Sequence, residues 1–215
     1  MILYTLQDNG YIDFSEKIKM YPTEKFNMYV NITNRCNCNC TFCLRHLKED
    51  HKLWLKDGEP SVEEIKQAFL NAPMDNVKEI VICGFGEPTI RLDDLIKVLK
   101  FIREKYPQMK VRMNTNGLSD LEFGKSTALM FEGLLDTISI SLNESTAQKY
   151  LDVTRSRFGI KSYNAMLEFA SQCKKYIPNV VVTIVDIIGE AEIAACKKVC
   201  EQYGLNLRIR KYEKN

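Results

Sequence analysis

Four cysteines stand close together in the run Cys36-Asn37-Cys38-Asn39-Cys40-Thr41-Phe42-Cys43. Three of them, Cys36, Cys40 and Cys43, form a C-x3-C-x2-C array directly after an apolar stretch. Thiolates held a few residues apart on one loop are typical ligands of iron–sulfur clusters. Because three cysteines bind only three irons of a four-iron cluster, the fourth iron stays open to a small molecule. The array therefore predicts chemistry at an open iron.

Other uses of these cysteines remain possible. A zinc site or a closed cluster could use all four cysteines, or three of them with His46 or His51 as the fourth ligand. Zinc sites, however, usually combine two closely spaced ligand pairs separated by a spacer, and no second pair follows at the usual distance. A disulfide framework is disfavoured, because eight cysteines in 215 residues are few for a stapled secreted fold. The first residues also lack the basic start and apolar core of a signal peptide. We therefore expect a cytoplasmic protein.

Composition places few further limits on function. With 215 residues and 45% hydrophobic content, the chain can bury a full core in one domain. No apolar run approaches the length that spans a bilayer, so we expect no membrane partner. A formal net charge of +2 does not demand nucleic acid.

Hydrophobic periodicity predicts alternating strands and helices. Short runs rich in Val, Ile and Leu predict strands at residues 28–33, 78–83, 110–114, 137–142, 180–185 and 205–210. Helical patterns occupy residues 62–71, 92–106, 120–131, 145–152, 162–176 and 191–203. This alternation indicates an α/β fold with a parallel sheet, in which ligands gather beyond the carboxyl ends of the strands. The cysteine loop and three polar or glycine-rich segments follow strands at that end.

These motifs resemble the radical S-adenosylmethionine (SAM) superfamily, whose signature C-x3-C-x-aromatic-C is matched by Cys36, Cys40, Phe42 and Cys43. Residues 84–88, Gly-Phe-Gly-Glu-Pro, are similar to the Gly-Gly-Glu-Pro motif of that family. The resemblance covers residues 28–211 and implies a partial (β/α)6 barrel, with residues 28–215 as a single core domain. Residues 1–27 are then an N-terminal extension, which we expect to form a β-hairpin. More narrowly, the chain resembles the small TatD-associated radical SAM proteins.

The resemblance implies two cofactors and a reaction. Cys36, Cys40 and Cys43 would bind a [4Fe-4S] cluster, and SAM would chelate its open iron. Reductive cleavage of SAM would give a 5′-deoxyadenosyl radical that abstracts hydrogen from an unassigned substrate. Cys38 is expected to be a spectator, since a fourth thiolate would block SAM. A reducing partner such as flavodoxin or ferredoxin would supply the electron.

Nine further residues are candidates for binding the cofactor. Phe42 would pack near adenine, as the resemblance implies, or fill the core. Glycines after the second strand permit close approach of the backbone to a ligand or form an ordinary turn. Polar side chains end the third, fourth and fifth strands and would line a wet cavity or pair in the core. The set is Phe42, Gly84, Gly86, Glu87, Asn114, Asn116, Ser141, Asn143 and Asp186.

Two other functions stay open, a glycyl-radical-type activating enzyme and a non-catalytic module with a closed cluster or zinc. The substrate is expected to be macromolecular or anionic, because a basic segment follows the cluster motif. Its members are Arg45, His46, Lys48, His51 and Lys52.

Overall fold

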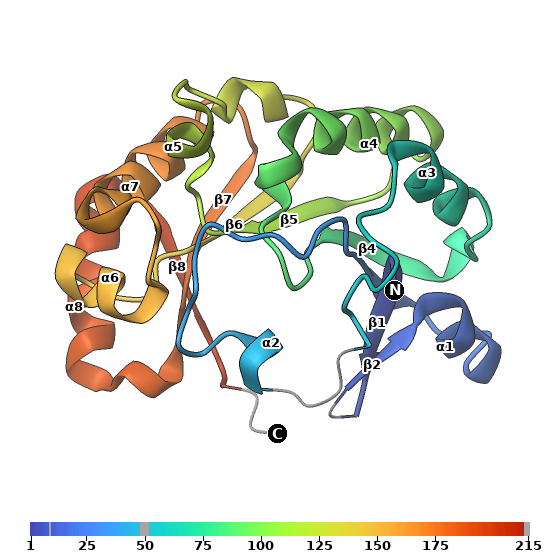
Figure 1. The fold of residues 1–215 in the computed structure, drawn as a ribbon, viewed down its shortest axis with the longest axis horizontal. Helices are drawn as coiled ribbons and strands as arrows, with labels where there is room; N and C mark the ends of the chain where they lie inside the picture. The colour runs from blue at the N-terminus through green and yellow to red at the C-terminus, as the bar shows by residue number, and fades with distance from the viewer. Residues whose placement is uncertain (9, 48–51, 213–215) are drawn as a thin grey trace. The chain divides into compact units, whose positions relative to one another are not determined.

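The computed structural model describes residues 1–8, 10–47 and 52–212, with only the backbone of residues 46 and 47 (Figure 1). The chain forms two compact units. The first unit comprises Met1–Cys36 and Lys48–Met113, and the second comprises Asn37–Leu47 and Asn114–Asn215. Among the described residues, no helix has both the length and the apolar character needed to cross a bilayer.

The first unit is built on strands in the order β2-β1-β3-β4-β5. Strands β1 (Leu3–Gln7) and β2 (Gly10–Asp13) pair antiparallel and confirm the expected hairpin. Strand β1 also pairs antiparallel with β3 (Phe26–Val30). From there the ladder is parallel, through β4 (Val77–Ile82) to β5 (Val111–Thr115), the strand in which the boundary between the units falls.

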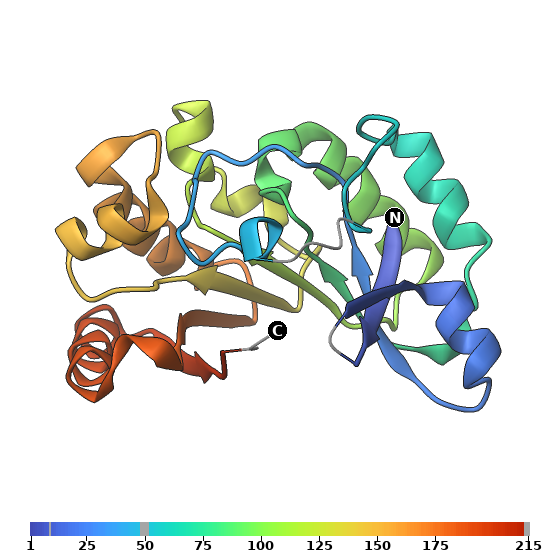
Figure 2. The same cartoon turned by 60° about the horizontal axis from the view of Figure 1, so that its bottom comes forward.

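A short helix in the N-terminal extension was not predicted. Helix α1 (Phe14–Met20) follows β2 directly and packs beside the hairpin (Figure 2). Its start is set by Asp13, whose carboxylate accepts hydrogen bonds from the backbone amides of Ser15, at 2.9 Å, and Glu16. Strand β3 begins at Phe26, two residues before its predicted start. The division into residues 1–27 and a single core domain stays a prediction.

The two longer helices of the first unit follow the predicted pattern. Helix α3 (Val62–Leu70) begins at a capping box, in which Ser61 and Glu64 each accept a hydrogen bond from the other's backbone amide. Helix α4 (Leu92–Lys105) lies beside it and buries an apolar stripe (Figure 1). Each fully buried Leu, Ile or Val contributes roughly 1.5–3 kcal/mol. The stripe is Leu95, Val98, Leu99 and Ile102.

The second unit is a three-stranded parallel sheet with helical crossovers. Its strands are β6 (Thr137–Ser141), β7 (Asn179–Val185) and β8 (Asn206–Arg210), paired in that order. Its longer helices are α6 (Ala147–Thr154), α7 (Ser162–Cys173) and α8 (Glu190–Tyr203). On β7 the buried Val180, Val182 and Ile184 belong to a nearly continuous apolar run, as expected of a parallel strand covered by helices, whereas β6 alternates buried Ile138 and Ile140 with Thr and Ser. The predicted α/β class with parallel strands is confirmed.

One predicted helix, residues 120–131, is wrong. The structure has α5 (Ser119–Phe123) and a separate 3₁₀ turn, η3 (Ala128–Phe131). Gly124 ends α5 in the left-handed conformation, with φ of +62°. The Asp120 carboxylate then accepts hydrogen bonds from the Thr127 amide and hydroxyl, at 2.8 and 2.7 Å. These bonds hold the turn between α5 and η3.

The remaining short helices connect these elements. They are α2 (Leu44–Leu47) and the 3₁₀ turns η1 (Met74–Asn76), η2 (Pro88–Arg91), η4 (Gly159–Lys161) and η5 (Asp186–Ile188).

Candidate functional site

In the first unit, the two glycines after β4 lie against the chain that leads into Cys36. A Cβ added to Gly84 would stand 2.1 Å from the Oδ1 atom of Asn31. A Cβ added to Gly86 would stand 2.4 Å from the Thr33 carbonyl oxygen and 2.5 Å from that of Arg35. The close approach of neighbouring protein atoms therefore explains why both positions are glycine, and contact of these glycines with a ligand stays a prediction.

Glu87 ties the glycine segment to the same stretch of chain. Its amide donates a 2.8 Å hydrogen bond to the Arg35 carbonyl. Its buried carboxylate accepts from the amide and hydroxyl of Thr89, at 3.1 and 2.8 Å, and caps η2. Phe85, between the glycines, is also buried and meets the Tyr11 ring edge to face. The segment thus has a structural role at the first cysteine, independent of any cofactor.

An ion-pair cluster holds the residues before Cys36. Arg35 donates from Nε and Nη2 to the two oxygens of Glu59, at 2.9 and 2.7 Å, and Thr33 also donates to Glu59. Arg91 approaches the same carboxylate at 3.9 Å and donates to the Ile32 carbonyl at 2.7 Å. Burial raises the pKa of Glu59, but the hydrogen bonds from Arg35 and Thr33 outweigh it and leave the pKa below its ordinary value. Glu59 therefore stays ionised at neutral pH.

In the second unit, the cysteine loop rests on the end of α6. The amide of Asn39 donates to the Thr154 carbonyl, and the amide of Thr41 donates to the Val153 carbonyl, both at 2.9 Å. The last carbonyls of a helix have no partner within the helix. The loop supplies those partners at alternate residues, and the backbone on either side of Cys40 is held in place.

A side-chain network anchors the same loop at Asn37. The side-chain amide of Asn37 donates from Nδ2 to the Glu122 carboxylate at 3.0 Å and accepts at Oδ1 from the Asn116 side chain at 2.6 Å. The backbone carbonyl of Asn37 accepts from the backbone amide of Arg157 at 3.0 Å. Arg157 and Glu122 also pair, at 2.5 Å. Asn116 was predicted to bind the cofactor, and here its side chain positions the cysteine loop. Asn37 was not predicted, although its place between two cysteines could have signalled a role.

The four clustered cysteines differ in environment. Cys36, Cys40 and Cys43 are half-buried, whereas Cys38 is buried, with its Sγ 3.6 Å from the Nδ2 of Asn116. All eight cysteines are free thiols. Among the described residues, no three Cys, His, Asp or Glu side chains are gathered as a metal site. Three partly exposed thiols on one anchored loop suit an iron–sulfur cluster, whose binding would bring the sulfurs together.

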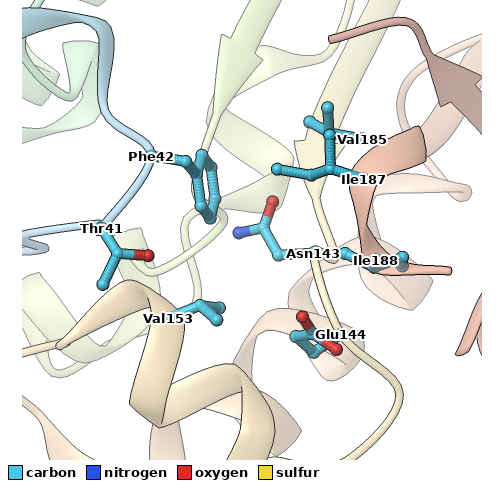
Figure 3. Close-up of a pocket in the computed structure, with 8 residues that line it drawn as sticks. All are labelled: Thr41, Phe42, Asn143, Glu144, Val153, Val185, Ile187 and Ile188. Atoms are coloured by element: carbon cyan, nitrogen blue, oxygen red, sulfur yellow. The ribbon is translucent and has the colours of Figure 1, made fainter. Parts of the chain in front are cut away.

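A pocket of about 220 Å³ lies in the second unit and brings together two predicted residues, Phe42 and Asn143. In Figure 3 the Phe42 ring and the Asn143 amide face each other, with aliphatic side chains around them. Asn143 is buried, and its Oδ1 has no hydrogen-bond partner among the residues that the structure describes. Such an atom costs free energy unless a ligand or water satisfies it. The other lining residues are Thr41, Glu144, Val153, Val185, Ile187 and Ile188.

Three other predicted residues do not line this pocket. Ser141 and Asn114 are half-buried near the carboxyl ends of β6 and β5. Asp186 is exposed, and its carboxylate accepts a 2.8 Å hydrogen bond from the Tyr212 amide. Their contact with a cofactor stays a prediction.

Glu144 is a pocket residue that the sequence did not reveal. Burial, a hydrogen bond with Glu192 and the charge of that residue raise the pKa of Glu144 to about 7. Burial also raises the pKa of Glu192, but hydrogen bonds from Lys149 and from Ser145 outweigh it and lower the pKa to about 2. The pocket wall therefore holds one carboxyl group that changes charge near neutral pH.

The basic segment after the cluster motif is only partly described. The Arg45 guanidinium donates to the Cys38 carbonyl at 3.4 Å, and Lys52 is exposed. Lys48, His51 and the side chain of His46 lie outside the described residues. The predicted substrate charge therefore stays a prediction.

Known proteins are similar to this chain in sequence or in fold. The "probable GTP 3′,8-cyclase" of Thermococcus kodakarensis is 27% identical over 169 residues, which are 78% of this chain and 50% of that protein. The "7,8-dihydro-6-hydroxymethylpterin dimethyltransferase" of Methanocaldococcus jannaschii is 30% identical over 150 residues, 68% of this chain and 27% of that protein. This chain thus spans half or less of these relatives.

Two solved structures show the fold. A radical SAM methyltransferase from Sphaerobacter thermophilus matches with a TM-score of 0.61 at 16% identity, over 87% of this chain and 55% of that one. The protein anSMEcpe with bound AdoMet, which is SAM, also matches with a TM-score of 0.61 at 16% identity, over 85% and 50%. The partial (β/α)6 barrel class is thereby confirmed, while the TatD-associated likeness stays a prediction. Because the profile of the radical SAM superfamily matches residues 30–194, the chain belongs to that superfamily, whose members use a [4Fe-4S] cluster and SAM.

Proposed function

We propose that this chain binds a [4Fe-4S] cluster through Cys36, Cys40 and Cys43 and cleaves SAM reductively, so that hydrogen is abstracted from a substrate. The observation that carries the proposal is the anchored loop with three half-buried thiols. The cluster and SAM, when bound, supply the 5′-deoxyadenosyl radical. Burial of Cys38 supports its spectator role, because its Sγ lies beside Asn37 and Asn116.

We propose that the pocket at Phe42 and Asn143 takes the adenosyl part of SAM. An aromatic ring offers a stacking face to adenine, worth about 1 kcal/mol beyond burial. The unpartnered Asn143 Oδ1 would accept a hydrogen bond from the nucleoside. The aliphatic residues Val185, Ile187 and Ile188 make the rest of the wall apolar. Glu87 and the two glycines then hold the approach to Cys36.

The substrate is proposed to be anionic, a class that includes charged macromolecules. Exposed Lys52 and half-buried Arg45 put positive charge in the segment after the cysteines. Relatives named for GTP act on an anionic nucleotide, which favours the same class. We further propose a cytoplasmic protein reduced by a flavodoxin or ferredoxin, since eight free cysteines suit a reducing compartment.

Reductive cleavage of SAM tests the proposed function. Protein reconstituted anaerobically with iron and sulfide, then mixed with SAM and dithionite, is expected to form 5′-deoxyadenosine and methionine in equal amounts. A matched control is Cys200→Ala, which removes a buried thiol far along the chain and should leave the reaction intact. If cluster-loaded protein yields no deoxyadenosine, the proposal is wrong.

A further inference from the structure

The turn after β6 presents two consecutive polar residues to the pocket. Asn143 adopts the left-handed conformation, with φ of +64°, which asparagine tolerates better than most residues. The amides of Leu142 and Asn143 both donate to the Thr183 carbonyl, and the Glu144 amide donates back to the Leu142 carbonyl. This tight turn places the side chains of Asn143 and Glu144 in the same pocket wall (Figure 3).

Glu144 shares a hydrogen bond with Glu192, a carboxylate that has two further partners of its own. Glu192, on α8, accepts from the Ser145 amide at 2.7 Å and pairs with Lys149 of α6. Glu192 therefore keeps its negative charge, and the Lys149 ammonium is engaged in its ion pair with Glu192. Cys196, also on α8, is a further titratable neighbour, and burial raises its pKa to about 12, so it is neutral.

The other described residues that line the pocket are uncharged. The cysteine loop contributes Thr41 and Phe42, α6 contributes Val153, and the end of β7 with η5 contributes Val185, Ile187 and Ile188. An ionised Glu144 would thus stand between an apolar wall and the Glu192 carboxylate. Both the lost hydration and the like charge favour the neutral form.

We propose that Glu144 contacts the adenosyl group as a neutral carboxylic acid, so that binding in this pocket requires a proton on Glu144. This inference rests on the proposed function, because it takes the pocket to be the adenosyl site. The ligand would displace water from the pocket and make an ionised Glu144 still less favourable. Protein with Glu144 ionised must therefore take up one proton from solvent as the ligand binds.

The expected pH dependence has a definite sign. Below the pKa of Glu144 the carboxyl group already carries its proton, and affinity is constant. Above that pKa each pH unit lowers affinity tenfold, because the competent fraction falls by that factor. With a pKa of about 7, affinity should fall about tenfold between pH 6 and pH 8.

The test is calorimetric binding of 5′-deoxyadenosine to cluster-loaded protein without reductant, at pH 6 and pH 8. This probe has no group that titrates in that interval. Wild-type protein should lose about tenfold in affinity at pH 8. Glu144→Gln, which mimics the neutral carboxyl group, should bind at both pH values with the pH 6 affinity of wild type. Glu168→Gln, an exposed change on α7, should behave as wild type.

Two results would overturn the inference. Glu144→Gln that is folded and iron-loaded but binds weakly at pH 6 would show that the carboxylate is needed. Wild-type affinity that is equal at both pH values, or too weak to detect at either, would exclude the proton requirement. SAM cleavage, measured separately at pH 6.5, distinguishes the two proposals. Cleavage without the pH effect refutes only this inference, and the pH effect without cleavage refutes only the proposed function.

Discussion

Replacing Cys36, Cys40 or Cys43 by alanine is expected to abolish the iron–sulfur cluster, whereas Cys38→Ala is expected to retain it. Three thiolates are proposed to hold the cluster, so that each loss would leave an iron without its ligand. Cys38 is buried against Asn37 and Asn116, and we expect it to bind no iron. Iron and sulfide analysis should give about four of each per chain for wild type and Cys38→Ala, and almost none for the other three.

The Cys38→Ala variant also decides between the open and closed sites. A closed cluster or a zinc site uses four sulfurs and would lose metal in all four variants alike. Equal loss of iron in Cys38→Ala, with the protein still folded, would contradict the open site. Retention of iron with normal SAM cleavage would exclude both alternatives.

Gly86→Val is expected to destabilise the fold and to lower iron content and SAM affinity together. The new Cβ would meet two backbone carbonyls, those of Thr33 and Arg35, at 2.4 and 2.5 Å. Backbone atoms cannot turn aside as a flexible side chain does, so the chain before Cys36 must move. Overpacking of this kind costs roughly 1–3 kcal/mol or more. Thermal unfolding and iron analysis of the reconstituted protein measure both effects.

Gly10→Val is the matched control for this change. A Cβ at Gly10 has its nearest neighbour, the Gln7 carbonyl oxygen, at 3.9 Å, an ordinary contact. A glycine that served only the SAM contact would keep its iron when changed to valine. If Gly86→Val unfolds at the same temperature as Gly10→Val and binds the full amount of iron, the packing of the glycine segment against residues 33–35 affects neither stability nor cluster binding.

The fold was predictable where the signals are local. The capping box at Ser61 and the apolar stripe of α4 are written in neighbouring residues, and both elements are confirmed. The predicted helix over residues 120–131 failed because a helical pattern continues past Gly124, where the chain turns. That turn depends on hydrogen bonds between Asp120 and Thr127, which periodicity cannot show.

The site was predictable only in its local motif. The cysteine spacing and Phe42 can be read from consecutive residues. The anchoring of Asn37 joins it to Glu122, 85 positions away, and to Arg157. The environment of Glu144 likewise depends on Glu192, from another helix. Such partners meet through the tertiary fold, and the sequence shows their types without their contacts.

The most direct measurement is the electron paramagnetic resonance spectrum of the reduced cluster with and without SAM. An iron without a cysteine ligand can bind SAM, and this changes the electronic environment of the cluster. The account predicts that SAM shifts the g values in wild type and in Cys38→Ala alike. A spectrum from fully loaded protein that stays unchanged at saturating SAM would contradict the open iron and the proposed function with it.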